Sequence, residues 1–282
     1  MKKSITPALL IALVFCVPAS AELQVGYDGQ PLPAGDASPL GTSYMLTDHH
    51  GGNWVDAEKS PTNSDDDLLC WAAVCANVLQ WTGWGNVAGL TDEDAIFSYY
   101  QQYWSDKGGM MEYGWEWWFD GTNRRQGHSG WAQLDTGQSG GGFWPNHEFS
   151  NYYEESGYSS AMYKIDQYLQ EGMGVGIAIY EEDGSGGHAI TVWGIDKGEG
   201  FNEYHGLWVT DSDDSKGDST PPDRLRYYRV QKGSYSWYLQ DFYGSDQWYI
   251  GPVQALAVPE PASLTVLAMG AIALLRRRRL VS

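Results

Sequence analysis

The stretch that decides the fold is DDDLLCWAAVCANVLQW at residues 65–81, where an acidic segment leads into small and apolar residues. The run 71–81 predicts a buried helix of about three turns, and TGWG at residues 82–85 predicts its end. Cys70 is therefore expected at a helix N-terminus, where unpaired N–H groups and the helix dipole favour an anion and lower the pKa of a thiol. We expect the aspartates of residues 65–67 to cap this helix.

Three later segments have the composition of strands. Residues 174–180 and 188–195 are rich in β-branched and aromatic side chains and are separated by a glycine-rich turn, and residues 206–210 form a third run. His188 would open the second strand, and Asp211 would follow the third. Strand ends and helix N-termini are rigid positions with exposed rims, which suit a catalytic site.

These residues have the chemical types of a nucleophile, a base and an orienting group. A Cys70 thiolate attacks an amide carbonyl, His188 carries the proton, and the Asp211 carboxylate fixes the imidazole tautomer. Asp213 would lie on the same face as Asp211 if the chain stays extended. Taken alone, His188 is as well explained as a buried core histidine.

The cysteines support a catalytic interpretation. Cys16 lies in an N-terminal leader, which leaves Cys70 and Cys75. Five residues apart on a helix, these two side chains point to different faces and are too far apart for an unstrained disulfide. A thiol left unpaired in an exported protein indicates a functional role, which we assign to Cys70. Cys75 is expected to be a small buried apolar residue.

Several motifs resemble those of the immunoglobulin-degrading streptococcal (Mac/IdeS-like) cysteine endopeptidases, a papain-like family. The resemblance implies an α+β, papain-like cysteine peptidase fold, with the nucleophile at the N-terminus of a central helix and the His and Asp residues on an antiparallel sheet. The motifs that carry it are DDLLC-x-AA at 66–73, N-x-L-x-W at 77–81, GHAI-x-x-WG at 187–194 and VTDSD at 209–213.

The resemblance also implies a role for each site residue. Cys70 would be the nucleophile, His188 the base and Asp211 the group that orients the imidazole, with Asp213 as a supporting carboxylate. The oxyanion hole would consist of the Cys70 backbone N–H and the side chain of Lys59. The implied reaction is hydrolysis of peptide bonds through a thioester, with a protein or peptide as substrate.

Both ends of the chain look like targeting signals. Residues 1–21 combine two lysines, an apolar run and Ala-Ser-Ala, which predicts a secretory signal peptide. Residues 258–282 contain Pro-Glu-Pro, the apolar run 264–275 and four arginines, and resemble the PEP-CTERM sorting signal of Gram-negative bacteria, which an exosortase recognises and processes. The apolar run is short for the roughly 20 residues of a membrane-spanning helix. We expect a short transmembrane helix that associates transiently with the membrane.

The remaining residues, 22–257, are long enough for one domain, which we predict to be the peptidase domain. The terminal segments hold six of the 17 Lys and Arg residues and one of the 36 acidic residues, which leaves 11 basic against 35 acidic residues and a formal charge of −24. This charge argues against a nucleic-acid partner. The acidic segment 211–222 departs from the EF-hand pattern, because its glycine is one place late and Pro222 takes position twelve, so we predict no metal or cofactor.

Two other functions remain open at this point. One is a non-catalytic extracellular module, retained at the cell surface or in the extracellular matrix, that binds glycan or protein through exposed aromatic residues. The other is a transglutaminase-like acyl transfer by the same triad, because a thioester can react with water or with an amine. The tryptophans of the possible binding module are Trp115, Trp117, Trp118, Trp131 and Trp144.

Overall fold

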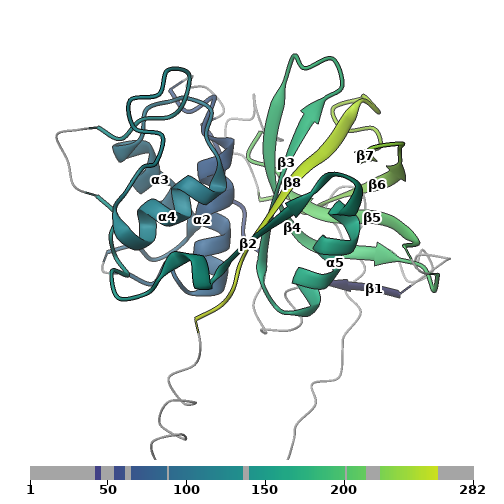
Figure 1. Ribbon diagram of the computed structural model, residues 1–282, viewed down its shortest axis with the longest axis horizontal. Helices are drawn as coiled ribbons and strands as arrows, with labels where there is room; N and C mark the ends of the chain where they lie inside the picture. The colour runs from purple at the N-terminus through teal and green to yellow at the C-terminus, as the bar shows by residue number, and fades with distance from the viewer. Residues whose placement is uncertain are drawn as a thin grey trace, which may run out of the picture.

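The computed structural model describes residues 42–45, 54–60, 65–87, 89–135, 140–200, 202–213 and 223–259. The predicted signal peptide at residues 1–21, the apolar run at 264–275 and the arginine tail lie outside this part of the chain. Helices α2, α3 and α4 lie on one side of the molecule, and strands β3 to β8 with helix α5 lie on the other (Figure 1). The elements are β1 (Thr42–Met45), α2 (Cys70–Thr82), α3 (Glu93–Tyr103), α4 (Met111–Asp120), η1 (Phe149–Asn151), β2 (Tyr153–Gly157), η2 (Tyr158–Ser160), α5 (Ala161–Gln170), β3 (Gly174–Glu181), β4 (Gly187–Lys197), β5 (Tyr204–Thr210), β6 (Arg226–Lys232), β7 (Trp237–Leu239) and β8 (Trp248–Leu256).

Six strands form a closed antiparallel barrel. They pair in the order β4-β3-β8-β7-β6-β5, and β5 pairs in turn with β4. Strands β1 and β2 extend the barrel by pairing with β4 and β8. The predicted papain-like α+β fold with a central helix is therefore wrong, because the barrel closes on itself and α2 packs against its outside.

The closure depends on the length and bending of β4. This strand has 11 residues, and it pairs with β3 along its first half and with β5 along its second. Its pairing with β5 shifts register between Val192 and Gly194, and again between Asp196 and Lys197. Bulges of this kind bend a strand and increase its twist. Because β4 bends, it can pair with β3 and also with β5, the last strand in the order, and this pairing closes the barrel.

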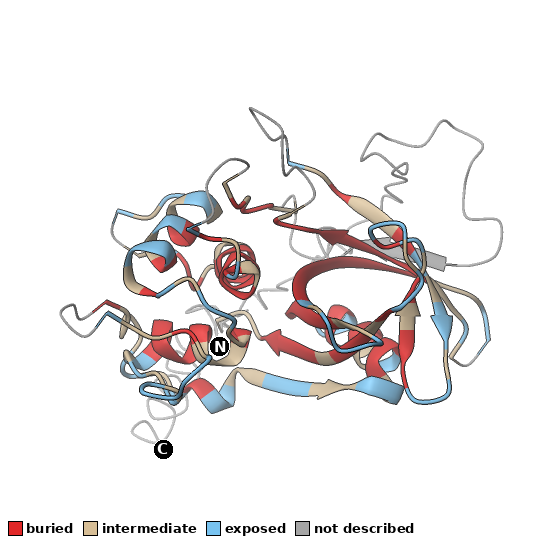
Figure 2. Cartoon of the chain, turned by 90° about the horizontal axis from the view of Figure 1, so that it is seen from above, coloured by how far each residue is buried: buried red, intermediate tan, exposed pale blue. Residues whose placement is uncertain are grey.

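Each half of the molecule has its own hydrophobic core. Alternate residues of β3, Val175, Ile177 and Ile179, point into the barrel core, to which α5 also contributes. The second core is formed by α2, α3 and α4. Figure 2 shows buried segments on both sides, with the exposed residues around their outer rims.

The opposite face of β3 carries small residues that let α2 approach closely. A Cβ atom added to Gly174 would lie 2.7 Å from Val78 Cγ1, and one added to Gly176 would lie 2.5 Å from Val74 Cγ1. Because real Cβ atoms do not approach this closely, the two glycines set the separation between the helix and the barrel. That separation in turn fixes where the N-terminus of α2 lies relative to β4.

The local predictions for these elements are confirmed. Helix α2 begins at Cys70 and ends at Thr82, and Gly83 follows in the left-handed conformation at φ 87°. The three predicted strands are present as β3, β4 and β5. The predicted aspartate cap is wrong, since no side chain caps α2. The Asp66 carboxylate instead accepts hydrogen bonds from the Ser60 backbone N–H at 2.7 Å and from the Gln101 amide at 2.9 Å.

Most of the tryptophans singled out from the sequence are core residues. Trp115, Trp117 and Trp118 are at most 1% exposed and pack in the helical core. Trp144 is partly buried and donates its indole N–H to the carbonyl of Trp84 at 2.9 Å. The exposed aromatic platform expected of a binding module is therefore not formed by these four.

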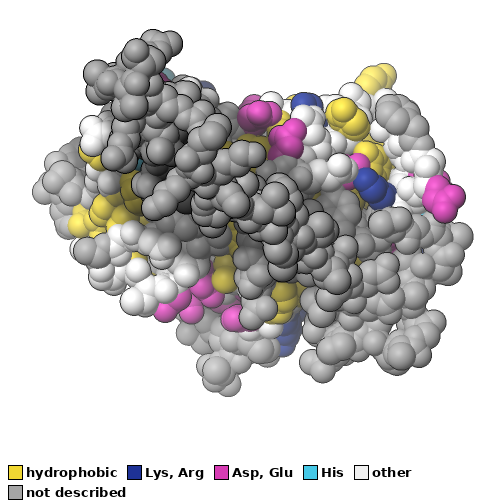
Figure 3. Space-filling view, turned by 90° about the horizontal axis from the view of Figure 1, so that it is seen from below, with side chains coloured by type: hydrophobic (Ala, Val, Ile, Leu, Met, Phe, Trp, Pro, Cys, Tyr) yellow, Lys and Arg dark blue, Asp and Glu magenta, His cyan; other side chains and the backbone are white. Residues whose placement is uncertain are grey.

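In the face shown in Figure 3, acidic side chains lie over both the helical and the barrel sides.

The contact between α2 and β3 leads to a test of stability. We expect Gly176→Val to lower the free energy of unfolding by about 1–3 kcal/mol, despite the preference of valine for strands, because the side chain would overlap Val74. Gly108→Ala is the control, since a Cβ there meets nothing within 4 Å. Urea unfolding followed by tryptophan fluorescence measures both. Equal stability of the two variants would contradict the close approach.

Candidate functional site

The first component of the site is the thiol at the start of α2. Cys70 is the first residue of the helix and is partly exposed. The N–H groups of a first turn have no partner within the helix. The second cysteine has a different environment, because Cys75 is fully buried one turn further on and lies 3.4 Å from the Met111 carbonyl oxygen. Both thiols are free.

The second component is an imidazole at the start of strand β4. His188 is the second residue of β4, pairs with Ile179 of β3 and is 8% exposed. Its Nε2 atom lies 2.6 Å from Asp211 Oδ1. Because Asp211 engages Nε2, the other ring nitrogen, Nδ1, is the one left to serve the thiol.

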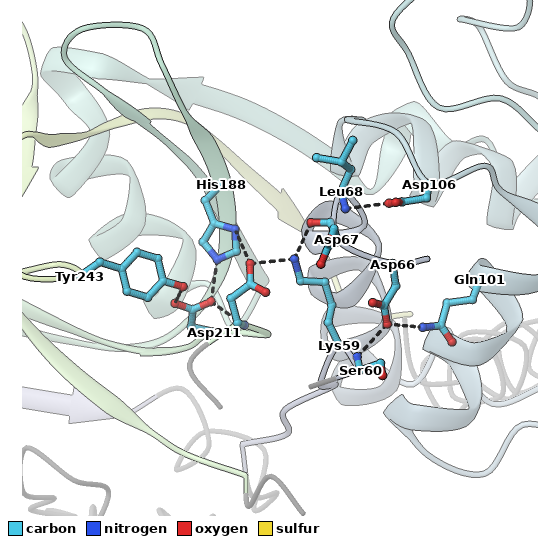
Figure 4. A network of polar contacts seen from close by, with 11 residues as sticks. Lys59, Ser60, Asp66, Asp67, Leu68, Gln101, Asp106, His188, Asp211 and Tyr243 are labelled. Atoms are coloured by element: carbon cyan, nitrogen blue, oxygen red, sulfur yellow. Dashed lines mark hydrogen bonds and ion pairs between the residues drawn. The ribbon is translucent and has the colours of Figure 1, made fainter. Parts of the chain in front are cut away.

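The third component is a fully buried carboxylate just beyond the end of β5. Besides His188, Asp211 Oδ1 accepts the backbone N–H of Asp213 at 3.0 Å. Asp211 Oδ2 accepts the hydroxyl of Tyr243 at 2.7 Å (Figure 4). Both carboxylate oxygens are therefore held, so the carboxylate cannot rotate away from the imidazole. Sequence analysis missed Tyr243, and no local pattern marks it, because it lies in a turn after β7.

The charged forms of Cys70, His188 and Asp211 stabilise one another. Burial by itself raises the pKa of the Cys70 thiol, but the charge and hydrogen bond of His188 and the charge of Lys59 lower that pKa below its ordinary value. Burial disfavours a charged His188, yet the charges of Asp211 and Cys70 raise the pKa of His188 to about 10. Burial also opposes ionisation of Asp211, but the charge and hydrogen bond of His188 hold its pKa below the ordinary value. These effects favour a thiolate–imidazolium pair over a neutral thiol beside a neutral imidazole.

Asp213 and Lys59 form a second ionic layer. The Lys59 ammonium, 2% exposed, lies 2.7 Å from Asp213 Oδ2 and donates to the Asp67 carbonyl oxygen at 2.7 Å (Figure 4). Asp213 Oδ2 is also 3.7 Å from His188 Nδ1. The chain turns at residues 212–213, so the condition of an extended chain is not met, but Asp213 still faces the imidazole. The oxyanion role of Lys59 stays a prediction, and its observed contacts are with Asp213 and Asp67.

A buried amide joins the elements that carry the site. Asn77, on α2, accepts the Ala57 backbone N–H at 2.7 Å. Its Nδ2 atom donates to Thr191 Oγ1 of β4 at 3.0 Å and contacts Thr210 Oγ1 of β5 at 3.4 Å. Thr210 directly precedes Asp211, and Ala57 lies two residues before Lys59. The sequence contained Asn77 within a helical motif, but its partners are separated from it by 20 to 133 residues.

The site opens into a cleft of about 340 Å³ between the helical half and the barrel. Cys70, His188 and Asp213 line it together with residues of the segments 108–111 and 130–131. Barrel residues Ala178 and Tyr180 form the opposite wall. The arrangement presents a thiolate to a bound molecule, beside an imidazolium that can donate a proton. Within the described ranges, no group of three or more His, Cys, Asp or Glu side chains is arranged to hold a metal ion.

Comparison with known proteins identifies the C-terminal segment. Residues 257–279 match the family model described as the PEP-CTERM protein-sorting motif. The chain carries a PEP-CTERM sorting motif. The predicted sorting motif is thus confirmed, and it implies recognition by exosortase machinery and export to the cell surface.

The rest of the chain has no counterpart among the curated proteins that were compared with it. A search of curated proteins finds no match. The resemblance of the motifs between residues 66 and 213 to the streptococcal endopeptidases gains no support from this search. None of the helices in the described part of the chain is long and apolar enough to cross a membrane. The predicted transmembrane segment at 264–275 lies outside that part.

The ion pair predicts how the reactivity of Cys70 depends on pH. Because the pKa of Cys70 is lowered, alkylation by iodoacetamide should become fast at a lower pH than for an ordinary thiol, and a second change should follow near pH 10, where His188 loses its proton. In His188→Ala the rise in alkylation rate that reports ionisation of Cys70 should move to higher pH, because burial then acts on the thiol without its positive neighbour. Mass spectrometry of the alkylated peptide measures the rates. An unchanged profile in His188→Ala would show that the two groups are not coupled.

Proposed function

We propose that the protein is an exported cysteine endopeptidase that hydrolyses peptide bonds in proteins or peptides. The observation that carries the proposal is that the helix-terminal thiol of Cys70 interacts with the His188 side chain, whose Nε2 lies 2.6 Å from the buried carboxylate of Asp211. A histidine used only for packing would not need a buried carboxylate held by a further hydroxyl and a backbone N–H. The proposal rests on this site and not on the fold.

The geometry supports the following sequence of bond changes. The Cys70 sulfur forms a bond to the substrate carbonyl carbon, and the carbonyl electron pair moves to its oxygen. The intermediate collapses, the C–N bond breaks, and the proton on His188 Nδ1 passes to the leaving amine, which leaves a thioester. A water molecule then gives a proton to His188 and attacks the thioester. The acid product leaves, and the thiolate–imidazolium pair is restored.

Asp211, Tyr243 and the first turn of α2 have supporting roles in this proposal. Asp211 stabilises the imidazolium and keeps Nδ1 directed at the sulfur. Tyr243 keeps Asp211 in place. We assign oxyanion stabilisation to the Cys70 backbone N–H, because loss of one such donor costs about 3–4 kcal/mol of transition-state stabilisation. Lys59 adds positive charge from behind the cleft wall.

We also propose the finer steps of export. The signal peptide is removed before Glu22, and the exosortase of a Gram-negative host removes the basic tail, so that residues 22–257 act at the cell surface or in the extracellular matrix. The match to the sorting motif at residues 257–279 supports this order of events. The C-terminal segment would then contact the membrane only in transit.

Cleavage of peptides tests the enzymatic proposal. Cys70→Ala should abolish cleavage of a diverse peptide library, and His188→Ala should match it, because the nucleophile and the base act as a unit. Cys75→Ala is the matched control and should keep most of the activity, since that thiol is buried behind the site. Mass spectrometry of the product termini, with and without an excess of a primary amine, separates hydrolysis from acyl transfer.

Two outcomes of this experiment would contradict the proposal. Activity that survives in Cys70→Ala would remove the nucleophile. Products that all carry the added amine, with none hydrolysed, would make the protein an acyl transferase.

Processing can be tested in the native host. The intact mass of the protein recovered from the cell surface should correspond to a chain that starts near Glu22 and lacks residues 276–279. Changing Pro259-Glu260-Pro261 to alanines should leave the tail in place and reduce release from the membrane fraction, because the exosortase would lose its motif. Recovery of the unaltered protein with its arginines intact would contradict the processing step.

A further inference from the structure

The cleft beside Cys70 has a predominantly apolar lining on both walls. On the helical side, Leu68 is 48% exposed, and Met110 and Trp131 are partly exposed. Tyr180, partly exposed, faces them from the barrel. We propose that Trp131, with Met110 and Tyr180, forms a subsite for a large apolar side chain of the peptide, next to the bond that Cys70 attacks. This inference rests on the proposed function, because it names the substrate class of that site.

The Trp131 ring is held in position before any substrate binds. The Arg125 guanidinium lies 5.0 Å from its ring centre, and Tyr113 packs edge-on against it at 5.9 Å. The Gln133 amide donates to the carbonyl oxygens of Trp131 at 2.9 Å and of Arg125 at 3.0 Å. A surface fixed in this way loses little conformational entropy on binding, so more of the burial energy appears as affinity.

The same loop is tied to the other cleft-lining segment. The backbone N–H of Ala132 donates to the Gly108 carbonyl oxygen at 2.9 Å, and Trp104 and Leu134 form an isolated β-bridge. Trp131 therefore keeps a fixed position relative to Gly108. It has a fixed position relative to Cys70 as well, because the indole N–H of Trp71 donates to the Lys107 carbonyl oxygen at 3.1 Å.

Of the charged residues that line the cleft, Asp67, Asp213 and His188, the last two form ion pairs within the protein. Asp213 pairs with Lys59 at 2.7 Å, and His188 is engaged by Asp211 at 2.6 Å. These groups serve the thiol end of the cleft and give an ionic substrate side chain no uncompensated counter-charge. Burial of an apolar side chain against Trp131 needs no such partner and is favourable by itself.

Two glycines of the segment 108–111 have different surroundings. A Cβ on Gly109 would overlap the Trp71 ring, 2.7 Å from Nε1, so Gly109 allows the backbone to pack on that ring. Gly108 is exposed, lines the cleft, and has open space where a side chain would project. A larger residue at position 108 should fill part of the subsite without disturbing the core. Trp131→Ala would therefore remove the apolar wall of the subsite, and Gly108→Leu would block the space beside it.

The test uses peptidyl chloromethyl ketones in which each of the two residues nearest the ketone is varied in turn among Phe, Leu, Ala, Asp and Lys. The Cys70 sulfur displaces chloride and forms a C–S bond, so labelling needs the thiol and the cleft but not turnover. Rates for each variant are divided by its rate with iodoacetamide, which reports the thiol alone. At one of the two positions the unaltered protein should label with Phe roughly ten- to a hundredfold faster than with Ala.

The variants should change this preference in a defined way. Trp131→Ala should reduce the Phe-to-Ala ratio to about threefold or less, and Trp131→Phe should restore part of it, because a smaller ring still offers apolar surface. Gly108→Leu should slow labelling by the Phe reagent more than by the Ala reagent. Tyr235→Ala removes a ring that is 86% exposed outside the cleft and should leave the ratio unchanged. Melting temperatures exclude unfolding as the cause.

The outcomes separate the subsite from the proposed function. An unchanged ratio in Trp131→Ala, or a preference for Asp or Lys in the unaltered protein, would overturn the subsite. Selective labelling without cleavage of any peptide that carries the preferred residue would keep the subsite and overturn the peptidase.

Discussion

The structure depends on one buried side-chain amide. Asn77 is 2% exposed and connects helix α2, the segment that carries Lys59, strand β4 and the end of strand β5. A buried polar group without a partner costs about 1–3 kcal/mol, so any slip between these elements would be penalised at several hydrogen bonds together. The bonds lie within two turns of Cys70 and directly before Asp211. The amide therefore determines the distance between the thiol on the helix and the carboxylate on the barrel.

The ionic groups extend this connection to the surface of the cleft. The chain has few basic residues, yet Lys59 is buried beside the site and held between a carboxylate and a carbonyl oxygen. Because Asp213 faces both Lys59 and His188, its negative charge offsets the two positive groups. The alternation of charge from Lys59 through the partly exposed Asp213 and His188 to Asp211 makes burial of Lys59, His188 and Asp211 tolerable. It also gives the thiolate a positive environment in a strongly acidic protein.

Function and sorting occupy separate parts of the chain. The candidate site is built from residues between Lys59 and Tyr243, and the sorting motif begins at residue 257, directly after the last barrel strand. Strand β8 ends at Leu256; it pairs with β3 along its length, with β7 at its start and with β2 along its second half. The motif is thus attached to a barrel strand, and pairing with neighbouring strands holds that strand in place.

The sequence by itself determined four local elements, α2, β3, β4 and β5, and the residues from which the candidate site is proposed. Helix α2 could be predicted because its apolar periodicity and Gly83 act over a few residues, and β3, β4 and β5 could be predicted because glycine-rich turns bound β-branched runs. Local signals do not specify which strands close a sheet. Barrel closure required pairing of β4 with β5 and bulges in the ladder that only the tertiary structure shows, and the papain-like expectation was wrong for this reason. The contact of Tyr243 with Asp211, the burial of Trp115, Trp117 and Trp118, and the use of Asp66 as a loop anchor were likewise decided by packing, because each depends on residues distant in the chain.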